Sequence, residues 1–446
     1  MWRAADSSNA PRLILGLRLD ELTPGIVAGW RECATVSPLA AALAASDLVA
    51  SLAPALAADF AAAAARLGAE LPAGSSALVI LLPRKAPPGN GMRGDGLVDS
   101  FLATAPLLRA LGLADEEMSP AALCYRVLAA VAGGEICVDR LLVRQLPYPA
   151  VAPLPEAVPE ASAVVVVAHR GSIRHLEVAL RYVSKTVGMT CQVRVGLDVE
   201  HPGGYRALAA AGGEFYAVRP APRGPFVVRQ ELANRSTETA LAWQDSDDLP
   251  CADRFATLWR EIETSGCDLV GIHELRLDEL SGTVEARRYP LDVSAALQRG
   301  PRDPMLQGTA MMRLSAFQRA GGYSTDRRFG NDSQFLLRAY FHMRIRNADA
   351  FLYVRRRHGE SLTESPATGR GTPLRRQLME AWNADFEAVK AGTLRLEDSR
   401  LRPVDGPADY RFERFPEDRA AGPARGWPGR LAGLIRGVTR RRPGSR

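Results

Sequence analysis

The run of residues 163–168 (AVVVVA) constrains the fold of this chain more than any other segment. An uninterrupted series of small and β-branched apolar residues is typical of a strand buried on both faces of a parallel sheet. Helix-like and strand-like segments alternate after this run. Helices are expected at 173–187, 205–211 and 226–235, and strands at 192–197, 215–218 and 240–243. This order predicts an α/β fold with a mostly parallel sheet, whose ligands bind outside the carboxyl ends of the strands.

Five prolines in residues 147–160 separate this α/β region, residues 161–365, from an N-terminal part of different composition. Repeated prolines prevent regular helix and sheet pairing, so this stretch is expected to be a linker. Residues 1–146 are rich in Ala and Leu and are expected to form a mostly helical α+β accessory domain, whose role the sequence does not reveal. Its predicted segments are helices at 39–67 and 102–113 and strands at 77–82 and 136–143.

Residues 366–446 are expected to form one helix, at 375–391, followed by a basic tail. The chain of 446 residues carries a formal net charge of +6, and seven arginines between 425 and 446 have no acidic residue among them. Such a run favours a solvated tail. A short basic amphipathic helix at 431–438 that contacts the surface of a membrane stays open as the alternative. No nucleic-acid partner is expected.

The six cysteines show no CxxC spacing and no nearby Cys or His partners, which argues against a zinc site and against a disulfide scaffold. The first residues do not resemble a signal peptide. No stretch reaches the ~18 to 20 uninterrupted apolar residues that a membrane-spanning helix needs. The chain is therefore expected to be cytoplasmic, with reduced thiols and at most a peripheral contact with the inner membrane face.

An acidic cluster, Gln244-Asp245-Ser246-Asp247-Asp248, follows the strand expected at 240–243. Three carboxylates within four positions repel one another unless a cation or hydrogen-bond donors offset their charge. Oxygen ligands at the end of a buried strand suit a hard divalent ion such as Mn²⁺ or Mg²⁺. The alternative is a solvated acidic turn. A calcium loop is excluded, because glycine is missing at its sixth position and glutamate at its twelfth, Ala256.

Several motifs, taken in order, resemble the family 2 glycosyltransferases of the GT-A fold. The acidic cluster, with Leu249-Pro250 and the helix expected at 253–262, is similar to the family's "DxD" element and the loop and helix after it. Gln307-Gly308-Thr309 and Gly321-Gly322-Tyr323 resemble the segment before its catalytic acid, and Phe329-Gly330-Asn331-Asp332 resembles the "ED" element that opens a helix. Residues 353–363 (YVRRRHGESLT) resemble its closing strand and loop. The resemblance covers less than half of the chain.

The resemblance implies a Rossmann-like mixed sheet and a metal-dependent, inverting glycosyl transfer. The donor would be a nucleotide-diphosphate sugar, and the acceptor a glycan, a lipid-linked molecule or another hydroxyl compound. It implies Asp332 as the general base. The implied ligands of Mn²⁺ or Mg²⁺ are Asp247, Asp245 and His358. The implied donor-binding residues are Asp198, His169, Arg229, Asp245 and Asp248. Arg338 is a further candidate for phosphate binding.

Two departures from the family pattern leave a non-catalytic binding or scaffold protein open. Asn331 stands where an acid is usual, and His169-Arg170 follows the first strand, where the family tends to have a small polar residue. A phosphotransferase with Asp245 as nucleophile is a less favoured alternative, because that class needs a lysine and residues 249–365 contain none. Structural roles also stay open: a strand-end turn for Asp198 and a helix N-cap for Asp332.

Overall fold

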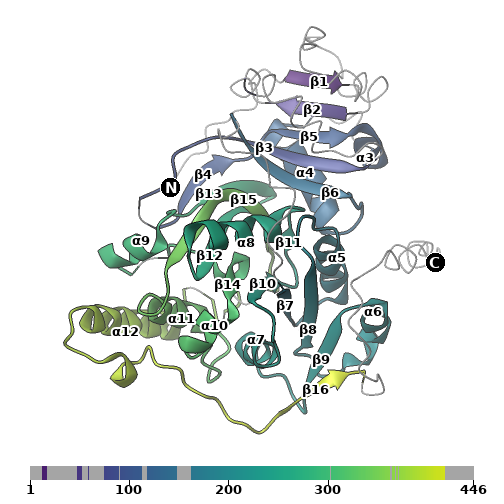
Figure 1. Ribbon diagram of the computed structural model, residues 1–446. Helices are drawn as coiled ribbons and strands as arrows, with labels where there is room; N and C mark the ends of the chain where they lie inside the picture. Colours follow the sequence, from purple (N-terminus) through teal and green to yellow (C-terminus); the bar gives the residue numbers. More distant parts are fainter. Residues whose placement is uncertain are drawn as a thin grey trace.

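The computed structural model describes residues 13–17, 48–52, 59, 75–89, 91–112, 118–147, 162–301, 303–361, 364–366, 368–369 and 371–416. These residues form an eleven-stranded mixed sheet and a smaller five-stranded sheet, which occupies the upper part of Figure 1. The predicted α/β fold with a mixed sheet is confirmed. The predicted division of the chain at residues 146 and 160 stays a prediction.

Four parallel strands in the order β10-β7-β8-β9 make the centre of the large sheet. The valines of β7 alternate between two hydrophobic cores, Val165 and Val167 facing one and Val164 and Val166 the other. This strand is therefore buried on both faces, as predicted. The strands are β7 (Ala163–His169), β8 (Cys191–Leu197), β9 (Glu214–Arg219) and β10 (Ala240–Asp245).

Helices cover both faces of this sheet. Residues of α5, α6 and α8 belong to one core, and residues of α7, α9, α10, α11 and α12 belong to the other. The predicted helices at 173–187, 205–211 and 226–235 are confirmed as α5 (Ile173–Ser184), α6 (Arg206–Ala211) and α7 (Pro225–Asn234). The others are α8 (Arg254–Ser265), α9 (Val293–Arg299), α10 (Leu314–Arg319), α11 (Asn331–Ala339) and α12 (Pro373–Lys390), with short 3₁₀ turns η4 (Pro202–Tyr205), η5 (Gln307–Thr309) and η6 (Leu396–Asp398).

Beyond β10 the sheet becomes mixed. β14 runs antiparallel to both β10 and β12, whereas β15 is parallel to β12. This arrangement brings the end of β15 beside the short strand β11, directly after the acidic cluster. The strands are β11 (Leu249–Pro250), β12 (Leu269–Asp278), β13 (Thr283–Arg288), β14 (Met311–Arg313) and β15 (Ile345–Arg357).

The N-terminal region contributes to both sheets. Its five-stranded sheet has the order β1-β2-β5-β3-β6, while β4 pairs with β13 of the large sheet. The strand predicted at 77–82 is confirmed, and the one predicted at 136–143 begins four residues later, at Arg140. The expected mostly helical composition is wrong for the described residues of this region, because more of them lie in strands than in helices. The elements are β1 (Leu13–Leu17), β2 (Leu48–Leu52), β3 (Ala77–Pro83), β4 (Arg93–Leu97), β5 (Phe101–Thr104), β6 (Arg140–Leu146), α3 (Ala105–Ala110) and α4 (Pro120–Ala132).

Two helix predictions in this region are wrong in part. Residues 48–52 and 101–104 are strands, β2 and β5, which pair with each other. Short apolar runs have no clear period, so their pairing with neighbouring strands decides between strand and helix. Most of the remaining residues of 39–67 lie outside the described residues.

The C-terminal segment follows the large sheet farther than predicted. The helix expected at 375–391 is confirmed as α12, which buries Trp382 and Phe386. The chain then runs along the lower side of Figure 1 to β16 (Arg411–Phe415), which pairs with β9 at the sheet edge. The linker from residue 148 and the basic tail from residue 417 lie outside the described residues.

Among the described residues we find no helix with the length and apolarity that a membrane crossing requires. Within the same residues five cysteines are free thiols, and Cys124, Cys251 and Cys267 are buried.

Candidate active site

A cleft of about 630 Å³ opens at the carboxyl ends of β7, β8 and β10. This is the edge where the α/β pattern places ligands. Apart from Arg338, the residues predicted for the site all line this one cleft, although they come from positions 169 to 358 of the chain. They are His169, Asp198, Arg229, Asp245, Asp247, Asp248, Asp332 and His358. Their chemical roles stay predictions.

Asp245 ends β10, with its carboxylate between Arg229 and the backbone of Gly308. Arg229 of α7 donates a hydrogen bond to Oδ1 of Asp245, and the two form an ion pair. A β-carbon at Gly308 would lie 2.6 Å from Oδ2 of Asp245, so only glycine fits here without displacing the carboxylate. Burial raises the pKa of Asp245 above its ordinary value, although the charge of Arg229 opposes this.

Asp247 and His358 form the second pair in the cleft. Nε2 of His358 lies 2.9 Å from Oδ2 of Asp247. The hydrogen bond to Asp247 raises the pKa of His358. Burial alone would raise the pKa of Asp247, but the hydrogen bond and charge of His358 lower it below the ordinary value. These two residues therefore favour their charged forms together.

The buried side chain of Asp248 connects β15 to the acidic loop through a hydrogen bond. Its Oδ1 accepts a hydrogen bond of 2.7 Å from the backbone N–H of Arg356. Burial raises the pKa of Asp248 well above its ordinary value, and the charges of Asp247 and Asp245 add to the effect. This geometry gives Asp248 a structural role, and its predicted donor contact stays a prediction.

The donor atoms fit a divalent cation in part. The carboxylate of Asp247 and Nε2 of His358 lie 2.9 Å apart and could both face one cation, provided that His358 loses the proton it shares with Asp247. Within the described part of the chain, no group of three or more His, Cys, Asp or Glu side chains is arranged to hold a metal ion. Mg²⁺ is often bound by one or two protein carboxylates together with substrate phosphates. Asp247 and His358 thus suit an ion that arrives with a diphosphate.

His169 and Asp198 line the cleft and are held in place by hydrogen bonds. His169 is buried, with Nδ1 2.9 Å from Ser246 Oγ and Nε2 3.0 Å from the Tyr205 hydroxyl. Burial lowers the pKa of His169 to about 4, so the imidazole is neutral near pH 7. Asp198 accepts hydrogen bonds from the backbone N–H groups of Arg223 (2.6 Å) and Gly224 (2.9 Å), which fix the loop before α7.

Asp332 lies in the first turn of α11 and borders the cleft. The helix N-cap is Gly330, which has a φ of +79°, so the alternative role of Asp332 as an N-cap is wrong. Only glycine adopts this left-handed conformation without strain. Oδ1 of Asp332 accepts a hydrogen bond of 2.9 Å from the backbone N–H of Ser333.

Asn331, which replaces an expected acid, is buried beside Asp332. Its Nδ2 donates hydrogen bonds to the carbonyl oxygens of Ser324 (2.7 Å) and Arg327 (3.1 Å). The amide therefore holds the loop that leads into α11. Since a carboxylate has no N–H to donate, these contacts explain the asparagine.

The expectation that Arg338 binds phosphate is wrong. Arg338 is buried away from the cleft lining and donates hydrogen bonds to the carbonyl oxygens of Ala320, Gly322 and Leu401. It therefore ties the loop before α11 to the C-terminal segment. Sequence alone could not separate this role from phosphate binding, because both use the same guanidinium donors.

Several basic residues of the cleft were not predicted. The segment YVRRRHG indicates some of them, since three successive arginines precede His358. Arg355 and Arg356 line the cleft, whereas Arg357 pairs with Asp278 and Glu364 outside it. The full set of missed basic residues is Arg170, His175, Arg328, Arg355, Arg356 and Arg375.

No family model matches this chain, and no curated protein matches its sequence. Among solved structures, the chain is similar to S. aureus TarS residues 1–349 in complex with UDP-GlcNAc, with 13% identity and a TM-score of 0.40 over 51% of this chain and 73% of that one. For TarS 1–349 in complex with UDP, the identity is 14% and the TM-score 0.37, over 53% of this chain and 74% of that one. Similarity this low carries no argument about activity, so the function is inferred from the site.

Proposed function

We propose that this chain is a metal-assisted, inverting glycosyltransferase that moves a sugar from a nucleotide-diphosphate donor to an acceptor hydroxyl. One observation carries the proposal: the Asp247–His358 pair and the carboxylate of Asp332 border the same cleft. Such a transfer needs cation ligands near the diphosphate and a base near the acceptor. The cytoplasmic location and the membrane contact of the basic tail stay part of the proposal.

In the proposed reaction, Asp332 accepts the proton of the acceptor hydroxyl while the hydroxyl oxygen bonds to the anomeric carbon of the sugar. The bond from that carbon to the diphosphate oxygen breaks, and its electron pair leaves with the nucleoside diphosphate. A single displacement inverts the anomeric carbon and requires no covalent intermediate on the protein.

Charge near the leaving group is the second requirement. A divalent cation held by Asp247, His358 and the diphosphate would supply positive charge there. The chain adds guanidinium groups of its own, since the exposed side chains of Arg170 and Arg328 border the cleft. Guanidinium groups form strong, charge-assisted hydrogen bonds with phosphate.

The alternatives fit these contacts less well. Asp245, the nucleophile of a phosphotransferase, is engaged by an ion pair with Arg229. A non-catalytic protein was suggested by Asn331, but this side chain supports a loop beside an intact Asp332. Neither Asn331 nor His169-Arg170, the two departures from the expected pattern, removes a group that the proposed reaction uses.

Hydrolysis of a panel of UDP-, GDP- and dTDP-sugars with Mn²⁺ tests the proposal. The wild-type protein should release nucleoside diphosphate from at least one donor, and EDTA should abolish the release. We expect Asp247→Ala to lose about 100-fold or more in rate, as for loss of one charge-stabilising group. Asp332→Asn should lower transfer by about 10²–10⁴-fold, as for loss of a general base, and leave donor affinity unchanged.

The control is Glu397→Ala, which removes a carboxylate exposed at η6. It should behave as wild type. The proposal fails if no nucleotide sugar binds or is hydrolysed, or if Asp247→Ala retains the wild-type rate. Retained transfer in Asp332→Asn would remove only the assignment of the base.

A further inference from the structure

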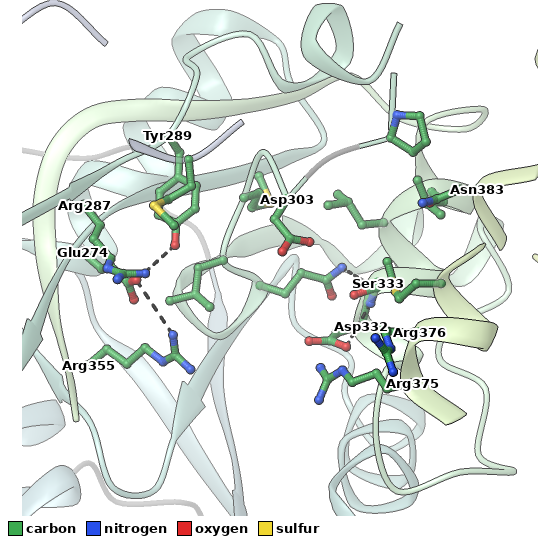
Figure 2. Close-up of a pocket in the computed structure, with 18 of the residues that line it drawn as sticks. Glu274, Arg287, Tyr289, Asp303, Asp332, Ser333, Arg355, Arg375, Arg376 and Asn383 are labelled. Carbon is green, nitrogen blue, oxygen red and sulfur yellow. Dashed lines mark hydrogen bonds and ion pairs between the residues drawn. The ribbon is translucent and has the colours of Figure 1, made fainter. Parts of the chain in front are cut away.

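A second cavity, of about 410 Å³, adjoins the cleft. It lies between the sheet and the helices α11 and α12. Figure 2 shows Glu274, Arg287 and Tyr289 on one side of it and Ser333, Arg376 and Asn383 on the other. Three residues line both this cavity and the cleft: Asp332, Arg355 and Arg375. The two spaces therefore meet at Asp332.

We propose that this second cavity binds the acceptor and that the acceptor is a neutral carbohydrate. The inference rests on the proposed glycosyl transfer. A general base must lie within hydrogen-bond reach of the acceptor hydroxyl, while the donor sugar approaches from the other side. Since the cleft with Asp247 and His358 takes the donor, the acceptor must reach Asp332 from the second cavity.

The charges of the cavity wall favour a neutral ligand. Four guanidinium groups and four carboxylates line it, so neither sign dominates. The arginines are Arg287, Arg355, Arg375 and Arg376, and the acids are Glu274, Asp303, Asp332 and Glu380. A ligand of either charge would meet like charges on part of this wall, which is unfavourable. Sugar hydroxyls both donate and accept, so they can satisfy carboxylates and guanidinium groups side by side.

Arg355 is part of this polar wall and lies at the junction of the cavity and the cleft. Its Nη1 lies 3.9 Å from Oε1 of Glu274, outside hydrogen-bond distance, and the two are joined by a dashed line in Figure 2. Oε2 of Glu274 is buried without a hydrogen-bond partner, and Oε1 accepts from the Tyr289 hydroxyl. Within the described residues the guanidinium of Arg355 forms this ion pair but no side-chain hydrogen bond, so its N–H groups are available to a hydroxyl at the junction.

The wall also has an apolar part, which suits the C–H faces of a sugar ring. The C–H faces of a pyranose pack against aliphatic side chains, while a few polar groups fix the ring's orientation. The apolar lining comes from Met92, Met305, Leu306, Leu336, Leu337 and Met379. Met92 belongs to the N-terminal region and Met379 to α12. Both segments flanking the α/β region thereby help to form the acceptor site.

Transfer to matched saccharides tests the inference. A nucleotide sugar that the wild type hydrolyses is supplied with neutral methyl hexosides or with the corresponding anionic methyl uronosides. We expect neutral hexosides to yield a disaccharide and to raise nucleoside diphosphate release severalfold, and the uronosides to do neither. The inference is wrong if the donor is hydrolysed but no neutral saccharide accepts the sugar, or if the uronosides serve equally well.

Variants of the second cavity locate the acceptor. Met379→Trp should fill the space and lower the ratio of transfer to hydrolysis at least tenfold, whereas Met379→Leu should keep it. Arg376 is exposed, so Arg376→Met should fold normally and raise the acceptor KM severalfold. Thermal stabilisation by the donor reports folding and donor binding in each variant. Unchanged acceptor use in both Met379→Trp and Arg376→Met would overturn the inference, whereas absence of donor binding in the wild type would overturn the proposed function itself.

Discussion

Nε2 of His358 lies 2.9 Å from Oδ2 of Asp247, and this contact joins the end of β15 to the loop after β10. The ring of His175 contacts His358 edge to face, with centroids 5.3 Å apart. The pair therefore has a structural role in the unliganded protein and would present its atoms to a cation when a diphosphate binds. The two roles have different pH dependence, because the ion pair needs protonated His358 whereas a cation needs its neutral form.

The stabilisation by His358 should depend on pH. Its pKa is raised by Asp247, so the folded protein holds the proton more tightly than the unfolded chain does. The contribution is fully present below the ordinary pKa of 6.5 and is lost as the pH rises through the raised value. Without divalent cations, His358→Asn should lower the Tm near about pH 6 and have less effect near about pH 8.5.

The control is His342→Asn, because the pKa of His342 is lowered, by partial burial and by the charges of Arg338 and Arg319. Removing this group should not destabilise the protein selectively at low pH. Thermal unfolding of both variants and the wild type across this range checks the result. An equal loss in His358→Asn at both ends of the range would contradict an ion pair with Asp247.

Gly308 is expected to be essential for the position of Asp245. A methyl group at this residue would lie 2.6 Å from Oδ2 and 3.3 Å from Cγ of Asp245. Overpacking of this kind costs about 1–3 kcal/mol, and here the carboxylate would also turn away from Arg229. Gly308→Ala should therefore weaken donor binding and lower stability to urea. Gly203→Ala is the control, because a β-carbon there has no atom within 4 Å, and it should behave as wild type.

The order of the motifs made the cleft predictable, but not the contacts inside it. Strand-end positions identify Asp198 and Asp245 because parallel strands end at one sheet edge. Asp332 and His358 follow only from the resemblance of the motifs around them. Sequence could not show that Asp248 accepts from Arg356 or that Asp198 holds residues 223–224. Such contacts depend on side-chain direction after folding, which no local pattern specifies.

The same limit applies to the ends of the chain. The strand β16 was missed because RFERF has only two apolar residues, and its pairing with β9 lies almost two hundred positions away in sequence. The second cavity was missed because residues of the α/β region form it together with Met92 and residues of α12, which the family resemblance does not cover. Long-range packing, rather than local propensity, forms both features.

Restoring an acid at position 331 should harm the protein. The amide Nδ2 of Asn331 donates to two carbonyl oxygens, of Ser324 and Arg327, in a buried place. A carboxylate would face these oxygens without donors, and an unsatisfied buried group costs about 1–3 kcal/mol, more when charged. Asn331→Asp should lower the free energy of unfolding by at least this amount, measured in urea. Wild-type stability combined with higher activity would instead indicate that the position is catalytic.

The contact between the N-terminal region and the large sheet can be tested at Arg288. This side chain is almost fully buried and donates to Asp95, Gln145 and the carbonyl oxygen of Pro83. Arg288→Met would leave the buried carboxylate of Asp95 paired with Arg93, whose side chain is 46% exposed, and would remove the donor to Gln145 and Pro83. Losing the buried partner of such a pair costs up to about 3–5 kcal/mol. We expect a corresponding loss in urea unfolding.

Adding Asp95→Asn to Arg288→Met should restore part of this loss, because the buried charge that Arg288 offset is then removed. The matched control is Arg84→Met, which breaks a more exposed ion pair with Asp349 between the same two regions. Exposed pairs contribute about 0–1 kcal/mol, so this variant should be nearly as stable as wild type. If Arg288→Met costs no more than Arg84→Met, the two regions are not held together by this buried contact. A large difference would instead mean that residues 1–146 and the α/β region unfold as one unit.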